Sequence, residues 1–172
     1  MDRAYRLIIL GAGGYGRTIA DIAAQLGYSV FFLDDNSDGS AVIGKCADYR
    51  EYIDDTTFLY PAFGDNRRRL DWILHILGNG GCIPTLVHPS AYVSPKAIVK
   101  MGTAILPNAI VNTGCEVECG CIINCGAIID HDCILEEGVH ICLGAIVKAE
   151  NRIPKCMKIE AGEVVKNRTY PL

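Results

Sequence analysis

Residues 91–147 read AYVSPKAIVKMGTAILPNAIVNTGCEVECGCIINCGAIIDHDCILEEGVHICLGAIV, and this stretch decides the fold. An aliphatic side chain recurs at every sixth position, usually two residues after a small one. Neither the turn of a helix nor the alternation of a strand produces a six-residue period. A short strand and a tight corner in every six residues predict a β-helix with three flat sides. The aliphatic series is Val93, Val99, Ile105, Val111, Val117, Ile123, Ile129, Leu135, Ile141, Val147, Ile153, Ile159 and Val165.

Residues 1–81 follow a different pattern, which predicts a small parallel α/β domain. Apolar runs and helical periodicity indicate strands, helices and a glycine-rich linker over residues 78–81. The last helix carries Leu70, Ile73, Leu74 and Leu77, which we expect to form its buried face. We therefore expect two domains, at 1–81 and 82–172. The predicted strands are 5–10, 28–33 and 57–63, and the predicted helices are 14–26, 47–53 and 66–77.

A glycine-rich turn, Gly11-Ala12-Gly13-Gly14-Tyr15-Gly16, lies between the first predicted strand and the first predicted helix. Backbone amides at a helix N-terminus attract phosphate groups. Asp34 follows at the end of the second strand, beside Asp35, where a carboxylate can accept a ribose hydroxyl. We expect no NAD, because the domain lacks the second half of a dinucleotide fold and the sequence has no evident hydride-transfer site. A nucleotide-linked substrate suits the domain better, and a turn that only packs helix against strand is the alternative.

Asp65 and Asn66 follow the third predicted strand and should emerge at the same sheet edge as the glycine-rich turn. They either contribute to a binding crevice there or cap the helix that begins beside them.

Nine cysteines without a CxxC pair predict reduced thiols rather than a disulfide framework. The spacing of Cys115, Cys119, Cys121 and Cys125 suggests zinc ligands, but the hexad repeat places the first and third inward and the other two near corners. Their sulfurs would not converge, so we expect no metal site. Cys115 and Cys133 are expected to stack as small core side chains.

His131 lies in Asp130-His131-Asp132-Cys133, at a hexad position that faces outward near a corner. An imidazole beside carboxylates is a candidate general base, although a surface histidine without a role is the common alternative. One coil further on is Ala149, a small side chain that leaves room for a reactant. Basic residues then gather in the last coils, either to hold a phosphorylated carrier or to form a solvated end cap. They are Lys148, Arg152, Lys155, Lys158, Lys166 and Arg168.

The composition excludes several classes of protein. With 16 basic and 20 acidic residues, a net charge of −4 disfavours nucleic-acid binding. The N-terminal sequence has neither the flanks of a signal peptide nor the length of a membrane span, so we expect a cytoplasmic protein without membrane association.

Taken together, these motifs resemble those of the hexapeptide-repeat acetyltransferases that act on sialic acids or on UDP-4-amino sugars. The resemblance implies an α/β N-terminal Rossmann-like domain followed by an all-β left-handed parallel β-helix. The matching segments are Gly11-Ala12-Gly13-Gly14 with Ala20-Asp21-Ile22-Ala23, Asp34-Asp35-Asn36, Gly64-Asp65-Asn66 with Arg69, His88-Pro89-Ser90-Ala91, and Asp130-His131-Asp132-Cys133 with His140 and Gly144.

The resemblance also implies roles for individual residues. His131 would be the catalytic base, supported by Asp132, and acetyl-CoA would lie along the β-helix between the subunits of a homotrimer. The residues implied for acetyl-CoA are His140, Cys142, Gly144 and Ala149. Those implied for the nucleotide sugar are Gly11, Gly13, Gly14, Tyr15, Asp34, Asp35, Asp65 and Asn66.

The resulting hypothesis is an acetyl-CoA-dependent acetyltransferase that acts on the amino group of a nucleotide-linked amino sugar. Two alternatives are open. One is O-acetylation of a sialic acid. The other is an inactive nucleotide-sugar-binding relative with a truncated CoA site, because the repeat becomes irregular at Asn151, Met157 and Glu163.

Overall fold

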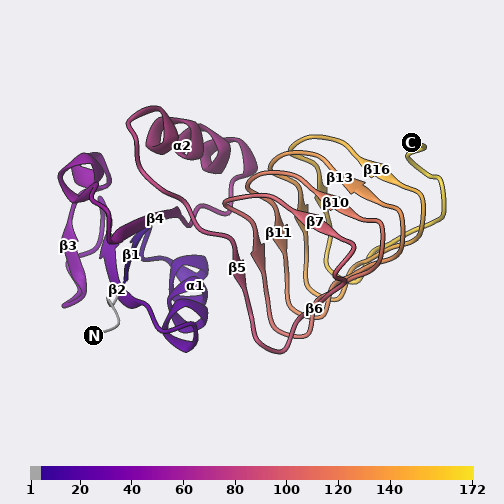
Figure 1. Cartoon of the computed structure of the whole chain (residues 1–172), viewed down its shortest axis with the longest axis horizontal. Helices are drawn as coiled ribbons and strands as arrows, with labels where there is room; N and C mark the ends of the chain where they lie inside the picture. The colour runs from indigo at the N-terminus through magenta and orange to yellow at the C-terminus, as the bar shows by residue number, and fades with distance from the viewer. Residues whose placement is uncertain (1–4) are drawn as a thin grey trace. The chain divides into compact units, whose positions relative to one another are not determined.

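The computed structural model describes residues 5–172, in which a parallel sheet with helices is followed by a long stack of short strands (Figure 1). The chain divides into two units, one ending at Pro84 and the other spanning Thr85–Leu172. We call them the α/β unit and the β-helix unit. Within residues 5–172, neither α-helix has the length and apolar character needed to cross a membrane.

The α/β unit is built on a four-stranded parallel sheet with the order β3-β2-β1-β4. The central strand is buried along Leu7–Leu10, because it pairs with β2 on one side and β4 on the other. One element was not predicted: β3, a three-residue strand at the sheet edge. The strands are β1 Arg6–Leu10, β2 Ser29–Leu33, β3 Val42–Gly44 and β4 Thr57–Pro61, and the helices are α1 Gly14–Gln25, the 3-10 helix η1 Cys46–Tyr52 and α2 Asn66–Gly78.

The predicted buried face of α2 was partly wrong. Leu70 and Ile73 are buried, but Leu74 is 68% exposed and Leu77 is 37% exposed. Ile76 and Arg69 complete the buried stripe instead. Arg69 is tolerated there because its guanidinium donates hydrogen bonds to Phe63 O (2.8 Å) and to an oxygen of Asn66 (2.8 Å).

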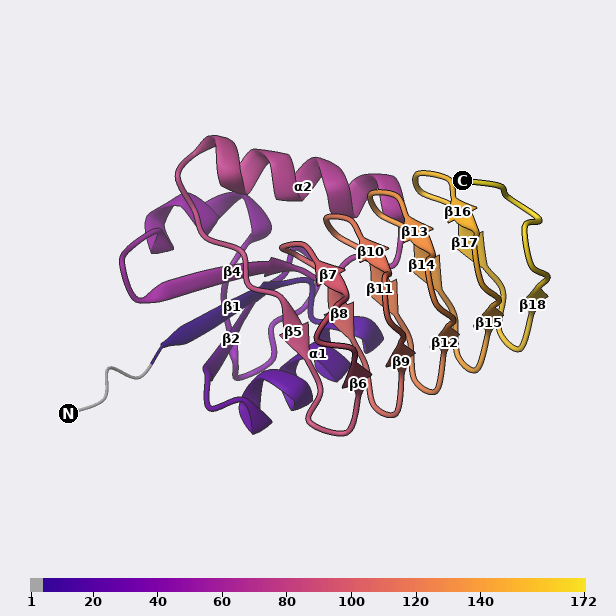
Figure 2. The same ribbon diagram turned by 45° about the vertical axis from the view of Figure 1, so that its right-hand side comes forward.

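The β-helix unit consists of fourteen two-residue strands that stack into three parallel sheets (Figure 2). The first face contains β5, β8, β11, β14 and β17, the second β6, β9, β12, β15 and β18, and the third β7, β10, β13 and β16. The strands are β5 Leu86–Val87, β6 Tyr92–Val93, β7 Ile98–Val99, β8 Ala104–Ile105, β9 Ile110–Val111, β10 Glu116–Val117, β11 Ile122–Ile123, β12 Ile128–Ile129, β13 Ile134–Leu135, β14 His140–Ile141, β15 Ile146–Val147, β16 Arg152–Ile153, β17 Lys158–Ile159 and β18 Val164–Val165.

The second residue of each strand points into the core, as the six-residue period predicts. Val111, Ile129 and Val147, which pair across the second face, are fully buried. The first residue of each strand points away from this core, although Leu86, Ala104 and Ile122 on the first face are buried as well. This arrangement confirms the β-helix that the aliphatic series predicts.

The corners between strands have a left-handed backbone at every sixth residue. L-amino acids disfavour a positive φ, so glycine occupies seven of these twelve positions. The glycines are 102, 114, 120, 126, 138, 144 and 162, and the other residues are Asn108, Asp132, Glu150, Cys156 and Arg168.

The thiols of the inward cysteines form hydrogen bonds with backbone carbonyls at the corners. The thiols of Cys115, Cys121 and Cys133 each donate to a backbone carbonyl fifteen residues further along the chain. The hydroxyl of Thr103 and the side-chain amide of Asn151 make the equivalent bond. Because these buried side chains satisfy carbonyls that the corners leave unpaired, they have a structural role. Among residues 5–172 there is no cluster of three or more histidine, cysteine or acidic side chains that could hold a metal ion.

Candidate active site

The glycine-rich turn brings the start of α1 against the end of β1. Gly11 has a φ of +104°, and a Cβ on Gly16 would lie 1.9 Å from Gly11 O. Gly13 and Gly14 are exposed, and a Cβ on either would meet nothing within 4 Å. Within the described residues neither amide donates to an acceptor, and both lie at the N-terminus of α1, as a phosphate site requires.

The carboxylates beside this turn hold the loops in place. Asp34 accepts hydrogen bonds from Ala12 N (2.6 Å) and from Asn36 N (2.8 Å), and these bonds lower the pKa of Asp34. Asp35 accepts a bond from Cys46 N (3.0 Å). Asp34 thus ties the glycine-rich turn to the end of β2, and this contact leaves part of its carboxylate available to a ligand.

The side chains of Asp65 and Asn66 both accept hydrogen bonds from residues of α2. Asp65 accepts a hydrogen bond from Arg68 N (2.7 Å), so the helix-capping alternative describes this residue. Asn66 accepts a hydrogen bond from Arg69, as described above.

Tyr15 is half-buried, and its hydroxyl lies 3.0 Å from that of Tyr60. Burial raises the pKa of Tyr15 to about 12, so its hydroxyl is neutral at physiological pH.

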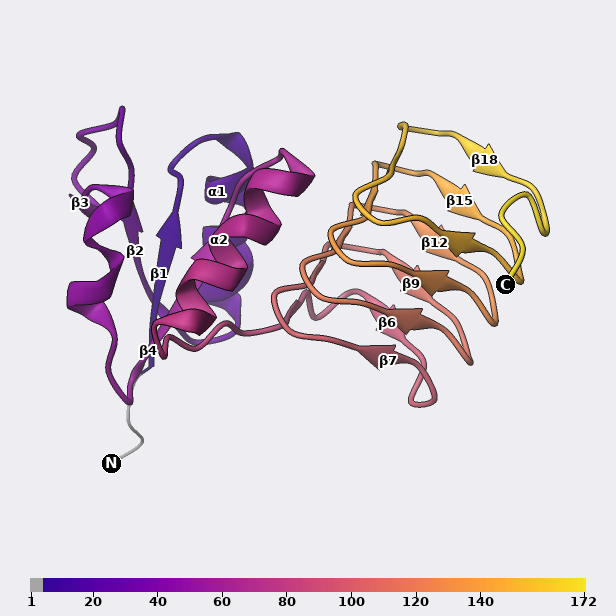
Figure 3. The ribbon, with the colours of Figure 1, turned by 90° about the horizontal axis from the view of Figure 1, so that it is seen from above.

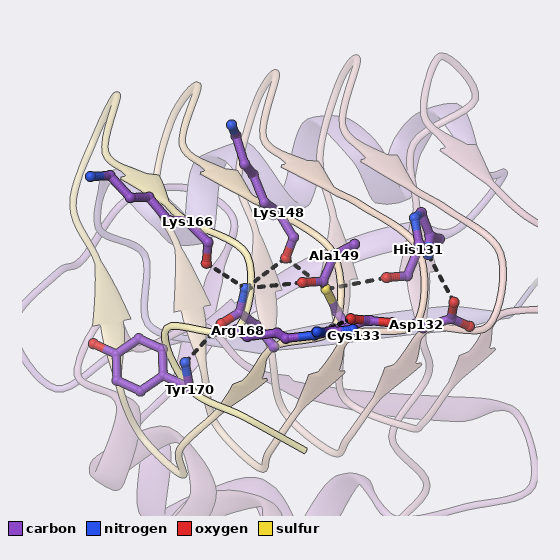
Figure 4. Close-up of polar contacts among 10 residues, drawn as sticks. His131, Asp132, Cys133, Lys148, Ala149, Lys166, Arg168 and Tyr170 are labelled. Atoms are coloured by element: carbon purple, nitrogen blue, oxygen red, sulfur yellow. Dashed lines mark hydrogen bonds and ion pairs between the residues drawn. The ribbon is translucent and has the colours of Figure 1, made fainter.

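His131 and Asp132 lie at the corner that joins the second face to the third, between β12 and β13 (Figure 4). His131 Nδ1 is 2.8 Å from Asp132 Oδ2, and the His131 side chain is 50% exposed. The hydrogen bond to Asp132 raises the pKa of His131, and the charges of Asp130 and Glu150 act in the same direction. With a proton on Nδ1 donated to Asp132, Nε2 presents its lone pair to solvent.

Ala149 lies one coil below His131, where Glu150 N donates to His131 O (3.3 Å). The side chain of Ala149 is almost fully buried. The feature that it does offer is a backbone amide. Ala149 N donates to no acceptor in residues 5–172. We call the site formed by His131, Asp132, Ala149 and Glu150 the histidine corner.

The other residues implied for acetyl-CoA lie elsewhere on the same unit. His140 begins β14 on the first face, with Nε2 3.3 Å from the side-chain amide of Asn124. Cys142 and Gly144 follow at the corner between β14 and β15, and burial raises the pKa of the Cys142 thiol. The strand β15 separates this corner from Ala149, so one chain does not bring all four residues together.

Four of the six basic side chains in the last coils form ion pairs. Their partners are acidic residues of the same or neighbouring coils, at 2.5 to 3.7 Å. Lys148 and Lys166 have no acidic partner in the described part of the chain. They lie one coil apart, and in Figure 4 the Lys148 side chain extends upward and the Lys166 side chain extends to the left. The paired residues are Arg152 with Glu136, Lys155 with Glu137, Lys158 with Glu160, and Arg168 with Glu150.

Comparison with known proteins identifies the family. A family model described as the PglD N-terminal domain matches residues 6–76. The acetyltransferase domain of PglB from Neisseria gonorrhoeae FA1090 is 34% identical, with a TM-score of 0.92 over 95% of this chain and 83% of that one. This chain belongs to the hexapeptide-repeat sugar acetyltransferases. It is therefore an acyltransferase, and its second unit is the left-handed parallel β-helix of that family.

Further solved structures have the same fold. The PglB domain has also been solved with acetyl-CoA. A histidine-to-asparagine variant of perosamine N-acetyltransferase from Caulobacter crescentus, solved with CoA and GDP-perosamine, is 25% identical, with a TM-score of 0.83 over 94% of this chain and 89% of that one. WeeI from Acinetobacter baumannii AYE, at 15% identity and a TM-score of 0.73 over 98% and 94% of the two chains, shares the fold.

The sequence of this acetyltransferase predicted no role for Glu150, and it indicated Asn151 only as an irregularity of the repeat. Glu150 donates a backbone hydrogen bond to His131 O, and Asn151 is a fully buried polar residue whose side chain bonds Lys148 O, Lys166 O and Tyr170 N. A signal for both was present. Glu150 occupies a corner position where glycine is usual, and Asn151 replaces the small inward residue of its hexad.

Proposed function

We propose that this enzyme transfers an acetyl group from acetyl-CoA to the amino group of a nucleotide-linked amino sugar, with His131 as the general base. The single observation that carries the proposal is the exposed His131–Asp132 pair beside the unpaired Ala149 amide. A base, a group that orients it and an oxyanion donor are what direct acyl transfer requires.

The chemistry follows from these groups. Asp132 accepts the hydrogen bond from Nδ1–H of His131, which leaves Nε2 unprotonated. Nε2 then accepts a proton from the sugar amine as the amine nitrogen attacks the thioester carbonyl. The Ala149 N–H stabilises the oxyanion that forms. As the carbon–sulfur bond breaks, the imidazolium returns the proton to the departing thiolate. The products are an amide and CoA, and His131 is ready for another cycle.

No cysteine is needed as an acyl carrier. Burial raises the pKa of the Cys142 thiol, which keeps it protonated, and the Cys133 thiol donates to Lys148 O. A thiol without a thiolate-stabilising partner is a poor nucleophile. Transfer is therefore direct.

The α/β unit holds the nucleotide sugar in this proposal. The free amides of Gly13 and Gly14 suit the diphosphate, and Asp34 and Asp35 lie at the same sheet edge. Tyr15, Asp65 and Asn66 shape that edge through their bonds to Tyr60 and α2. Support for the substrate class comes from the perosamine N-acetyltransferase, which was solved with a GDP-linked amino sugar.

The acetyl-CoA site in this proposal lies between copies of the chain in a homotrimer. The strands β6, β9, β12, β15 and β18 of the second face stack on one another (Figure 3). Their outward column consists of aliphatic side chains and one tyrosine, with Tyr92 54% and Val164 49% exposed. Such a column favours burial against another copy. A neighbouring copy can then bring its His140, Cys142 and Gly144 to the histidine corner, where Lys148 and Lys166 offer charge for the CoA phosphates. The column is Tyr92, Ile110, Ile128, Ile146 and Val164.

A cytoplasmic location is part of the proposal. The nine cysteines are all free, which fits a reducing compartment.

The test is mass-spectrometric detection of acetyl transfer from acetyl-CoA to a panel of UDP- and GDP-linked amino sugars and to free and CMP-linked sialic acids. Mass spectrometry avoids the thiol dyes that nine cysteines would confuse. We expect a single acetyl addition on an amino sugar, with fragment ions that locate it on nitrogen. Transfer only to a sialic acid hydroxyl would replace the proposal with O-acetylation. No transfer, together with no CoA binding by calorimetry, would identify a nucleotide-sugar-binding relative.

A further inference from the structure

Four left-handed residues form one column at the histidine corner, each separated by one coil. They are Gly114, Asp132, Glu150 and Arg168, with φ values of 72°, 56°, 58° and 55°. In the other two corner columns, six of eight positions are glycine and one is asparagine. Three consecutive charged residues thus occupy positions where glycine would be unstrained.

The positive φ angles of these three charged residues point to a functional role. A side chain in the left-handed region costs free energy, and such residues cluster at functional sites. Asp132, the first of the three, contacts His131 directly. The next two, Glu150 and Arg168, continue the column away from the imidazole.

Glu150 and Arg168 form a close ion pair, with Arg168 Nε 2.5 Å from Glu150 Oε2. The backbone of Glu150 donates to His131 O, which fixes the carboxylate one coil from the imidazole. Arg168 is held in turn by the chain that follows it, because Tyr170 N donates to the buried Asn151 side chain and Tyr170 O accepts from Arg152 N. The residues that follow Arg168 therefore hold its guanidinium against Glu150.

We propose that Glu150 and Arg168 are positioning residues for His131: Glu150 supplies negative charge one coil from the imidazole, and Arg168 offsets part of that charge by pairing with it. The inference rests on the proposed function, in which His131 is the base. Its consequence is that the pair sets how readily His131 takes up a proton. If the surrounding negative charge raised the pKa of His131 above the working pH, the imidazole would already be protonated and could not accept the proton of the amine.

All charged neighbours of His131 enter this balance. Asp130 and Asp132 flank it on the same corner, Glu150 and Arg168 follow from the coils below, and Lys148 lies on the adjacent column. The carboxylates raise the pKa of His131, and Arg168 lowers the pKa of Glu150 and keeps it ionised. Removing the Glu150 charge should lower the pKa of His131, and removing the Arg168 charge should raise it.

The test is an NMR titration of the His131 imidazole in the full-length protein. The chain has four histidines, so loss of one resonance in His131→Gln assigns the signal. We expect Glu150→Gln to move the titration midpoint down by about 0.3 pH unit and Arg168→Gln to move it up by a similar amount. In 1 M salt, which screens exposed charges, both shifts should shrink.

The control is Glu136→Gln, which removes a carboxylate that pairs with Arg152 away from the histidine corner. Its midpoint should equal that of the wild type. Equal midpoints in all four proteins would overturn the inference and leave the pair as a brace for the end of the chain. Shifts of the same sign in Glu150→Gln and Arg168→Gln would also overturn it. The titration needs no substrate, so these outcomes are independent of whether acetyl transfer is found. In an active enzyme, the acid limb of kcat/KM should move with the NMR midpoint.

Discussion

The two units present their functional groups in opposite ways. In the α/β unit, Asp34 and Asp65 use their carboxylates to hold loops and cap a helix, and the open groups are the amides of Gly13 and Gly14. In the β-helix unit most backbone groups form hydrogen bonds between coils, and the open groups are the His131 and Asp132 side chains together with the Ala149 amide. One site depends on the absence of side chains, and the other depends on side chains placed where glycine is preferred.

The largest expected effect tests the first half of this contrast. Gly16→Ala would place a Cβ 1.9 Å from Gly11 O, so we expect a loss of about 3 kcal/mol in the free energy of unfolding. Gly14→Ala is the matched control, because its Cβ would meet nothing within 4 Å. Far-UV circular dichroism at a helix wavelength during urea unfolding reports on this unit, which contains α1 and α2. Equal midpoints for the two variants would contradict the close packing of the turn.

The second prediction addresses the histidine corner. A Cβ on Gly114 would lie 2.2 Å from Asp132 Oδ1, whereas a Cβ on Gly126 would meet nothing within 4 Å. Both glycines have a φ near +70°, so Gly114→Ala and Gly126→Ala should each lose about 1 kcal/mol of stability. Only Gly114→Ala should displace the carboxylate that orients His131, and we expect its kcat to fall about tenfold.

Steady-state kinetics beside thermal unfolding separates these effects. If the two variants lose activity equally, the contact between residue 114 and Asp132 is unimportant for the reaction.

Much of the β-helix could be predicted from the sequence, because burial of one aliphatic residue in six follows directly from the geometry of a coil. The outward position of His131 follows from the same count. The strand β3 could not be predicted, since three residues at a sheet edge carry no periodicity. The α2 face was misjudged because Arg69, an apparent surface residue, satisfies its donors inside the fold.

The candidate site was less predictable than the fold. A carboxylate such as Asp34 can bind a ligand or a loop, and only the folded positions of Ala12 and Asn36 reveal the loop contacts. The Glu150–Arg168 ion pair could not be predicted either, because it depends on which corner residues stack on one another. The roles assigned to the site residues, and the assignment of residues 1–81 and 82–172 to separate binding tasks, stay predictions.

The third prediction concerns pH. Because hydrogen bonds from Ala12 N and Asn36 N lower the pKa of Asp34, its contribution to stability is present above the unfolded pKa of about 3.9 and is lost as the pH falls through the lower folded value. Asp34→Asn should therefore cost about 1 kcal/mol at pH 7, discounted for partial exposure, and less at pH 3. Urea unfolding at both pH values measures this. The exposed Asp21→Asn is the control, and an equal cost in both variants would refute the bridging role of Asp34.

The smallest expected effect is that of Cys142→Ala. Since burial raises the pKa of this thiol, we expect kcat to change by no more than about twofold. Intact-mass analysis of the wild-type enzyme during turnover should show no acetylated protein. A trapped acetyl-cysteine, or a large loss of activity in the variant, would argue for a covalent route instead of direct transfer.

The most direct test of the central claim is the rate of acetyl transfer by His131→Ala, measured by mass spectrometry on the best acceptor. His75→Ala, on the exposed surface of α2, is the matched control. We expect His131→Ala to lose about 10²- to 10⁴-fold in kcat while its unfolding transition stays unchanged, because the side chain is exposed. Activity within a few-fold of the wild type would show that His131 is not the base.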